Sequence, residues 1–438
     1  MHRAEFAPPS DQAAPGLKEL FSASLKVGLL GFGGPAAQIA LMHRIFVDEK
    51  KWIDEEHYLH ALSYCMLLPG HEAQQLATYV GWRLKGALGG VIAGAMFVAP
   101  GALVVLALSI FYGFYGSLPL VAAAFLGVKA AVIAFIGEAL LKVSKKALKK
   151  RIHFWIALAA FAALFLFGVP FPLVVLSAGL AGAMAQPKDH NPADLKKVRE
   201  GFGRPYAASL RVAALWGAIW LSPLALSFAV LGPEHPLSRV GALFAKLAVV
   251  TFGGAYAVLA YLQQQAVNVE GWLSSAQMID GLGLAETTPG PLVLVNQFVG
   301  YLAGWQAEGG GLALALATAA MASWQTFAPS FVWIFVGAPY ADALRHSARA
   351  AGALSAITAA VLGVIAQLAV IFASHVLFAD GDVVTTSWGH SIYAPSVASF
   401  NLTAALIAGL SAIMLVRYKA NPVLVVIGSL FAGLLFSR

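Results

Sequence analysis

The sequence has little charge and almost no cysteine. Of its 438 residues 11% are charged and 59% are hydrophobic, and the mean hydropathy is +0.76. A soluble globule of this size needs more polar surface, so the lipid bilayer is the expected surrounding. The one cysteine, Cys65, cannot form an internal disulfide, and no cysteine–histidine cluster has the spacing of metal ligands. We therefore expect no metal and no cofactor.

Signals for export, ATP binding and catalysis are also missing. The segment before Leu17 contains no apolar core followed by a small-residue cleavage site, so we expect no removable signal peptide. No P-loop is present. The loops offer no paired base and nucleophile, because the charged stretch from Asp48 to His57 is more simply a solvated interfacial face. An enzyme is therefore not expected, and the lack of a sizeable soluble domain argues against a membrane sensor.

Apolar stretches of bilayer-spanning length recur along the chain. Their length predicts helices, because a membrane barrel would show short alternating segments. We predict an all-α polytopic membrane protein with about 13 transmembrane segments. They lie at 17–45, 58–82, 88–114, 118–141, 154–167, 171–184, 207–231, 240–265, 277–302, 312–337, 350–372, 402–417 and 422–436. A re-entrant course of the Pro-Gly segments would give about 11 spans instead.

The net charge of +7 is concentrated in loops between apolar spans, unlike the surface of a nucleic-acid-binding protein. Basic residues at 142–151 and 188–211 predict two cytoplasmic loops, with Arg417 and Lys419 on the same side. The N-terminus is then cytoplasmic and the C-terminus periplasmic. The external segments 303–312 and 373–399 carry no lysine or arginine. The predicted external loop that contains Arg44, Lys50 and Lys51 is an exception to the rule that basic loops are cytoplasmic.

The sequence repeats itself at a constant offset. Lys26, Phe32, Gly33, Gly34 and Trp52 recur 220 positions later as Lys246, Phe252, Gly253, Gly254 and Trp272, and Pro69-Gly70 recurs as Pro289-Gly290 (290 − 70). Such a shift indicates a duplication. We divide the chain into an N-terminal repeat (1–187), a cytoplasmic linker (188–206), a linking transmembrane helix (207–231) and a C-terminal repeat (232–438). The odd number of spans through the linking helix predicts an inverted second repeat with discontinuous helices.

Glycine and proline interrupt the apolar helices at four matched places. Proline removes a backbone donor, and adjacent glycines adopt dihedral angles that side chains forbid. Broken backbone inside a bilayer is tolerated where it is buried in protein or lines a wet cavity, and a half-helix that begins there directs unpaired N–H groups outward. We predict that the four breaks converge near mid-membrane and bind an anion. Close helix packing across each glycine pair is the alternative.

Polar side chains near the breaks complete the candidate site. Lys26 and Lys246 would be costly in lipid without a counter-ion, unless they snorkel to the interface. Glu72, together with His71, is the candidate for proton exchange, with capping of its half-helix as the alternative. Glu138, Lys129, Gln325 and Gln367 are expected to pair helices. The predicted substrate-binding residues are Lys26, Phe32, Gly33, Gly34, Pro69, Gly70, His71, Glu72, Gln75, Lys246, Phe252, Gly253, Gly254, Thr288, Pro289, Gly290 and Asn296.

These elements resemble the chromate ion transporter family in its long, two-domain type, and the resemblance covers nearly the whole chain. Each domain of that family carries a Phe-Gly-Gly segment followed by a Pro-Gly-Pro-type segment. This chain departs from the pattern at His71 and Ala255, which stand where proline is expected. The first Pro-Gly break is therefore softer or handles substrate differently. The matching residues are Gly31–Pro35, Pro69, Gly70, Glu72, Gln74, Gln75, Tyr79, Thr251–Gly254, Thr288–Pro291 and Asn296.

The resemblance implies a secondary transporter of the bacterial inner membrane. It would export chromate and confer resistance, driven by the membrane potential or a proton gradient. The residues themselves predict only an oxyanion transporter, because chromate and sulfate are tetrahedral dianions of similar size. A sulfate or organic-anion carrier is the alternative. The expected partners are a chromate or sulfate oxyanion and the lipid bilayer, without nucleic acid, and a homodimer is compatible with the sequence.

Overall fold

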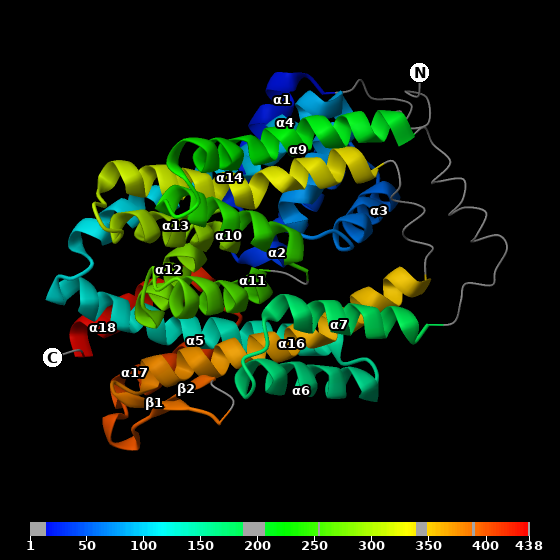
Figure 1. Cartoon of the computed structure of the whole chain (residues 1–438). Helices are drawn as coiled ribbons and strands as arrows, with labels where there is room; N and C mark the ends of the chain where they lie inside the picture. Colours follow the sequence, from blue (N-terminus) through cyan, green and yellow to red (C-terminus); the bar gives the residue numbers. More distant parts are fainter. Residues whose placement is uncertain (1–14, 187–205, 253–254, 339–347, 388–389, 437–438) are drawn as a thin grey trace.

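The computed structural model of the chain consists almost entirely of helices (Figure 1). The structure describes residues 15–186, 206–252, 255–338, 348–387 and 390–436. Several of its helices are long and apolar, and within these ranges the sheet is limited to one pair of strands. The prediction of an all-α polytopic membrane protein is confirmed.

The first half begins with a broken helix. α1 (Leu17–Leu30) ends at Gly31, and α2 (Gly34–His43) begins after a turn through Phe32 and Gly33. A π-helical segment, η1 (Arg44–Glu49), continues α2. α3 (Glu55–Cys65) then starts at the N-cap Asp54, whose side chain accepts a hydrogen bond from a first-turn backbone N–H. The first Pro-Gly break separates α3 from α4 (Glu72–Tyr115).

α4 consists of two antiparallel arms. The backbone leaves the helical conformation at Lys85 and at Gly86, whose φ is +65°. The arms then pack face to face, because a Cβ placed on Gly81 would overlap the carbonyl oxygen of Gly89. Glycines on both faces allow this approach. The predicted span 58–82 is therefore broken at Pro69-Gly70, the span 88–114 is helical throughout, and a tight turn joins the two.

The next three helices differ in length. α5 (Pro119–Ala147) has 29 residues and is long enough to cross a bilayer. α6 (Arg151–Phe165) and α7 (Phe171–Met184) have 15 and 14 residues, below the roughly 20 that a full crossing needs. They form a hairpin of short helices, with Gly168 in the left-handed conformation in its turn. Helices thus occupy the predicted spans 154–167 and 171–184, but neither helix crosses a bilayer by itself.

The second half follows α9, the linking helix. It repeats the order of elements seen in the first half: a broken helix, a π-helical segment, a short helix, a Pro-Gly break and an antiparallel pair of helices. α9 spans Tyr206–Leu231. The elements after it are α10 (Pro236–Val250), α11 (Ala255–Leu262), η2 (Gln263–Val269), α12 (Ser275–Thr287), the 3₁₀ turn η3 (Leu292–Leu294), α13 (Val295–Trp305) and α14 (Leu312–Gly337). The chain continues into α16 (Ala348–Leu377), α17 (Leu402–Val416) and α18 (Pro422–Phe436).

The recurrence follows the sequence offset closely. A shift of 220 positions places α1, α2 and α3 on α10, α11 and α12. The N-caps of α3 and α12, Asp54 and Ser274, are also 220 positions apart (274 − 54), and both accept a hydrogen bond from a backbone N–H three residues later. The proposed division into two repeats is supported by this agreement, although its boundaries remain a prediction.

A β-hairpin lies between α16 and α17. β1 (Gly381–Thr385) pairs antiparallel with β2 (Ser391–Pro395), and a 3₁₀ turn, η5 (Val397–Ser399), follows. The sequence predicted an external loop at 373–399, with the preceding span ending at Phe372. In the structure α16 continues to Leu377 and the polar segment folds back on itself as two strands, while its external location stays a prediction.

The helices form two layers with the broken elements between them (Figure 1). One layer contains α1, α4, α9 and α14, which pack on one another, and the other contains α5, α6, α7, α16, α17 and α18. α2, α11 and α12 lie between the layers. Each layer therefore combines helices from both halves of the sequence, and the glycine and proline breaks lie where the layers meet.

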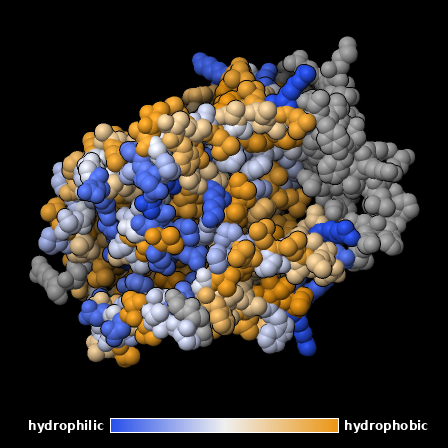
Figure 2. Space-filling model, in the orientation of Figure 1, coloured by the Kyte–Doolittle hydropathy of each residue, from blue (hydrophilic) through white to orange (hydrophobic). Residues whose placement is uncertain are grey.

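The outer surface suits a membrane. Within the described residues, four helices are long and apolar enough to cross one: α4 with its two arms taken together, α5, α16 and residues 209–231 of α9. Figure 2 shows apolar side chains over much of the visible face, with polar ones gathered toward the middle and the left end. Large exposed side chains such as Leu103, Leu120 and Leu180 need an apolar surrounding. The chain is therefore a multi-pass membrane protein.

Candidate functional site

The break between α1 and α2 is open. Gly33 and Gly34 have φ values of +85° and +79°, a region that disfavours side chains. A Cβ placed on Gly34 would meet no atom within 4 Å, so the break has free space at Gly34. α2 starts at Gly34 with Pro35 in its first turn, a position where the missing N–H is not needed for the helix.

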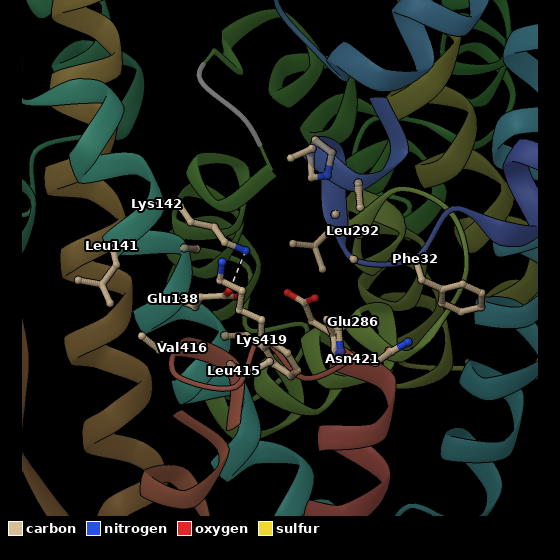
Figure 3. A pocket seen from close by; sticks show the side chains of 18 of the residues that line it. Phe32, Glu138, Leu141, Lys142, Glu286, Leu292, Leu415, Val416, Lys419 and Asn421 are labelled. Atoms are coloured by element: carbon tan, nitrogen blue, oxygen red, sulfur yellow. Dashed lines mark ion pairs between the residues drawn. The ribbon is translucent and has the colours of Figure 1, made fainter. Parts of the chain in front are cut away.

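A cavity of about 600 Å³ adjoins this break (Figure 3). Every residue from Phe32 to Ala37 lines it, together with the C-terminal part of α5, the turn between α17 and α18, and side chains of α11 and α12. The first turn of α2 therefore borders open space, as a half-helix that binds an anion requires. The ionisable residues in the lining are Glu138, Lys142, Lys145, Tyr256, Glu286 and Lys419.

Three of the five charged side chains have partners within the cavity wall itself. Nζ of Lys142 lies 2.7 Å from Oε1 of Glu138, one turn earlier on α5. The Tyr256 hydroxyl of α11 donates a 2.6 Å hydrogen bond to Glu286 of α12, which is only 9% exposed. Figure 3 shows Glu286 on the opposite side of the hollow from the Glu138–Lys142 pair. Three lysines against two carboxylates leave an excess of positive charge.

Each Pro-Gly break bonds to the backbone at the Phe-Gly-Gly break of the opposite half. The Gly70 N–H donates to the carbonyl oxygen of Thr251 at 3.0 Å, and the Gly290 N–H donates to that of Gly31 at 3.1 Å. Donors and acceptors are each separated by 220 positions (290 − 70, 251 − 31), so the bonds are related by the repeat. The prediction that these breaks present unpaired amides is wrong for Gly70 and Gly290, because carbonyls of the opposite half accept from both.

Gln38 reinforces this junction and was not predicted. Its Nε2 donates to the carbonyl oxygens of Gly31 at 3.0 Å and of Gly290 at 2.6 Å. The side chain is fully buried, and it joins the first break of one half to the second break of the other. The sequence signal for this role was a glutamine in an apolar helix, four residues after Gly34. Polar side chains inside such helices usually face the protein interior and bond to a partner.

Neither predicted lysine of the first spans lines the cavity. Nζ of Lys26 lies 3.6 Å from Oε2 of Glu49, and both side chains are about half exposed. Lys246 is exposed, with Nζ 5.7 Å from the ring centroid of Tyr261. These two lysines therefore do not face the cavity. Their exposure agrees with the alternative, in which the side chains extend to the membrane interface.

Residues after the first Pro-Gly break are placed by packing. His71 is buried as the N-cap of α4, and its ring centroid lies 5.2 Å from that of Phe327. Nε2 of Gln75 donates to the carbonyl oxygen of Pro69 at 2.7 Å. Glu72 occupies the first turn of α4, beside its N-terminus, where a carboxylate is favoured. His71, Glu72, Gln75, Pro69 and Gly70 do not line the cavity.

The matching residues of the second half are also held by protein contacts. Thr288 Oγ1 donates to the carbonyl oxygen of Ala285 at 3.0 Å, and Asn296 Nδ2 donates to Thr326 Oγ1 at 3.1 Å. Pro289 packs against α4, since its carbonyl oxygen would overlap a Cβ placed on Gly101. Phe252 packs against the core. Gly253 and Gly254 lie outside the described residues.

The sequence profile described as chromate transporter matches residues 18–183 and 238–434. The chain belongs to the chromate transporter family. The matched stretches cover most of the chain and flank the segment that contains α9. This result confirms the resemblance drawn from the Phe-Gly-Gly and Pro-Gly-Pro segments.

Relatives in this family extend over nearly the whole chain. It is 32% identical to a chromate transport protein of Pseudomonas aeruginosa over 95% of this chain and 91% of the relative. The identity to a chromate transport protein of Cupriavidus metallidurans is 31%, over 82% of each. An uncharacterized transporter of Methanocaldococcus jannaschii is 26% identical over 82% of this chain and 85% of its own. No solved structure matches the chain.

Several cavity residues of this chromate transporter family member were missed or assigned elsewhere. Glu286 and Tyr256 were not predicted, although an acidic residue in an apolar helix just before Thr288-Pro289 is a usable signal. Glu138 was expected to pair helices, whereas it bonds to Lys142 of its own helix. Lys142, Lys145 and Lys419 were interpreted as cytoplasmic anchors, and all three border the cavity.

Proposed function

We propose that this protein exports chromate from the cytoplasm across the bacterial inner membrane, using the cavity as the anion's path. The observation that carries the proposal is the opening of the α2 N-terminus into a cavity with three lysines. Chromate is the substrate that the names of two relatives state. Lys142, Lys145 and Lys419 were all predicted on the cytoplasmic side, so the cavity is accessible from the compartment from which chromate is removed.

Resistance to chromate follows from export, and the energy comes from the membrane potential or a proton gradient. The protein's own groups would balance a dianion with the free N–H groups of α2 and with lysine charge. The matched hydrogen bonds of Gly70 and Gly290 hold the breaks in place. Transport then needs no group beyond the side chains and backbone of this chain.

Counterflow in proteoliposomes tests the proposal. Purified protein is reconstituted in vesicles loaded with unlabelled chromate, and accumulation of labelled chromate is followed with sulfate as the competitor. We expect accumulation that depends on the protein and that excess external chromate abolishes. Accumulation of labelled sulfate without any of chromate would instead identify a sulfate carrier. The absence of counterflow with either anion would contradict oxyanion transport.

Proton coupling is expected at Glu286 rather than at Glu72. Glu286 lines the cavity and accepts from Tyr256, and Glu138, Lys142, Lys145 and Lys419 border the same space. A second negative charge beside a dianion repels it, so protonation of this carboxylate would accompany anion binding. We expect the Glu286→Gln variant to transport chromate at a rate that varies much less with pH than the wild-type rate, as measured by vesicle uptake between about pH 5.5 and about pH 8.

Glu72→Gln is the matched control. It removes a carboxylate from the start of α4, outside the cavity lining, so the pH profile of transport should remain that of the wild type. If the Glu72→Gln profile flattens while that of Glu286→Gln does not, proton exchange belongs to Glu72, as the sequence suggested. An unchanged profile in both variants would favour transport driven by the membrane potential without proton coupling.

A further inference from the structure

We propose that Lys419, in the turn between α17 and α18, binds the transported oxyanion directly. This inference rests on the proposed function and deepens it by naming the side chain that meets a tetrahedral dianion in the cavity. Lys419 lines the cavity opposite the first turn of α2, and within the described residues it has no carboxylate partner. Figure 3 shows its side chain directed into the hollow, on the same side as Lys142.

The hairpin of α17 and α18 brings this turn into the protein. Each helix has 15 residues, too few for a full crossing, and both pack along α5. The turn consequently borders the C-terminal part of α5, from Glu138 to Lys145. Lys419 was predicted to lie on the cytoplasmic side, which stays a prediction. Its place in the cavity wall was not predicted.

The backbone at Lys419 is a conformation that lysine does not favour. Its φ is +50°, in the left-handed region, where an L side chain meets the following carbonyl oxygen. The corresponding turn between α6 and α7 has Gly168 there, with a φ of +63°. The same bond closes both turns: Val169 N–H donates to Ala163, and Ala420 N–H donates to Met414, each at 3.0 Å. Glycine would adopt this turn without strain, so the turn geometry does not explain the presence of lysine at position 419.

The start of α18 adds donors next to this lysine. Asn421 lines the cavity as the residue before α18, and its Oδ1 accepts from the Val423 N–H at 2.9 Å, which leaves its side-chain NH₂ available as a donor. Pro422, the first residue of α18, lines the cavity as well. The N-termini of α2 and α18 therefore both border the space that Lys419 enters, and each favours a negative charge.

Lys142 differs from Lys419 because it already has an anionic partner. The carboxylate of Glu138 occupies Lys142 at 2.7 Å, so a dianion has to compete with it. Among the described residues neither Lys145 nor Lys419 has such a competitor, and of these two only Lys419 lies beside Asn421 and the start of α18. We therefore assign the first contact with the anion to Lys419, with Lys142 joining when its bond to Glu138 opens.

The test is the Lys419→Gly variant, measured by equilibrium binding of labelled chromate to purified protein and by counterflow. Glycine relieves the left-handed backbone, so the variant should fold at least as well as the wild type. We expect the apparent Kd and KM for chromate to rise about tenfold, the effect of losing one charged hydrogen bond. Lys419→Arg, which keeps the charge, should remain within about threefold of the wild type.

Lys51→Gly is the matched control. Lys51 also has a left-handed backbone, with a φ of +51°, and its counterpart at the repeat offset (271 − 51) is Gly271, with a φ of +62°. Because Lys51 does not line the cavity, its replacement should leave chromate binding unchanged. Wild-type binding with equal binding by Lys419→Gly would overturn the role of Lys419 and leave the proposed function intact. No oxyanion binding by the wild type would overturn both.

Discussion

A Gly34→Leu variant should insert into the membrane and fail to transport chromate. Gly34 has a φ of +79°, and a leucine forced into that region costs roughly 1–2 kcal/mol. Its side chain would also extend into the cavity, since a Cβ at this position meets no atom within 4 Å. The first turn of α2 would be covered where the anion is proposed to bind. We expect counterflow to fall at least tenfold, which corresponds to about 1.4 kcal/mol.

Gly232→Leu separates cavity filling from backbone strain. Gly232 follows α9 with a φ of +84°, and a Cβ there also meets no atom within 4 Å, but the residue does not line the cavity. The two variants should therefore show similar amounts of protein in the membrane, while Gly232→Leu retains transport. Retained transport in Gly34→Leu would exclude the α2 N-terminus from the anion path.

The sequence predicted the helical class and the matched breaks because both depend on local signals. Apolar length identifies helices in lipid, and a constant offset of 220 positions (290 − 70) shows in any comparison of the two halves. Contact between the breaks was also predictable, since irregular backbone at membrane depth needs protein around it. The acceptors of Gly70 and Gly290 were not, because they lie 181 and 259 positions away (251 − 70, 290 − 31).

The wrong assignment of Lys26 to the site could have been avoided by considering the helical periodicity of α1. Leu20, Ala23 and Val27 form the buried stripe of α1, and Lys26 lies outside this stripe. Successive residues on a helix point about 100° apart, so closeness to Gly33 in sequence did not imply the same face. Lys26 was assigned to the site because it lies close to Gly33 in sequence. Its surroundings depend instead on the face of α1 on which it lies.

The short hairpins escaped prediction for another reason. Apolar segments of 14 and 15 residues resemble short transmembrane spans, and their sequence does not show which helix they pack against. α6 and α7 both pack on α16, and α17 and α18 both pack on α5, so long helices of the layer support the short ones. Because α17 and α18 fold back along α5, the turn that carries Lys419 reaches the cavity wall. The site thus depended on tertiary packing that local patterns do not contain.

A Lys129→Met variant should lose much of the stability of the protein. Nζ of Lys129 on α5 lies 3.4 Å from Oδ1 of Asp280 on α12, and the Tyr112 hydroxyl of α4 donates to Oδ2 at 2.8 Å. Asp280 is only 4% exposed, so removal of the lysine leaves a buried carboxylate without a counter-ion. Breaking such a pair costs about 3–5 kcal/mol. Thermal unfolding in detergent should show a clear fall in Tm.

Adding Asp280→Asn to Lys129→Met should restore most of the loss. The double variant has no buried charge, and the amide oxygen of asparagine still accepts from the Tyr112 hydroxyl. Lys26→Met provides the exposed comparison, because its pair with Glu49 is about half exposed on both sides and should contribute less than about 1 kcal/mol. If Lys129→Met unfolds at the wild-type temperature, the carboxyl group of Asp280 needs no counter-ion. The bond from Tyr112 would then be sufficient to satisfy Asp280, and α5 would be held against α12 by apolar packing.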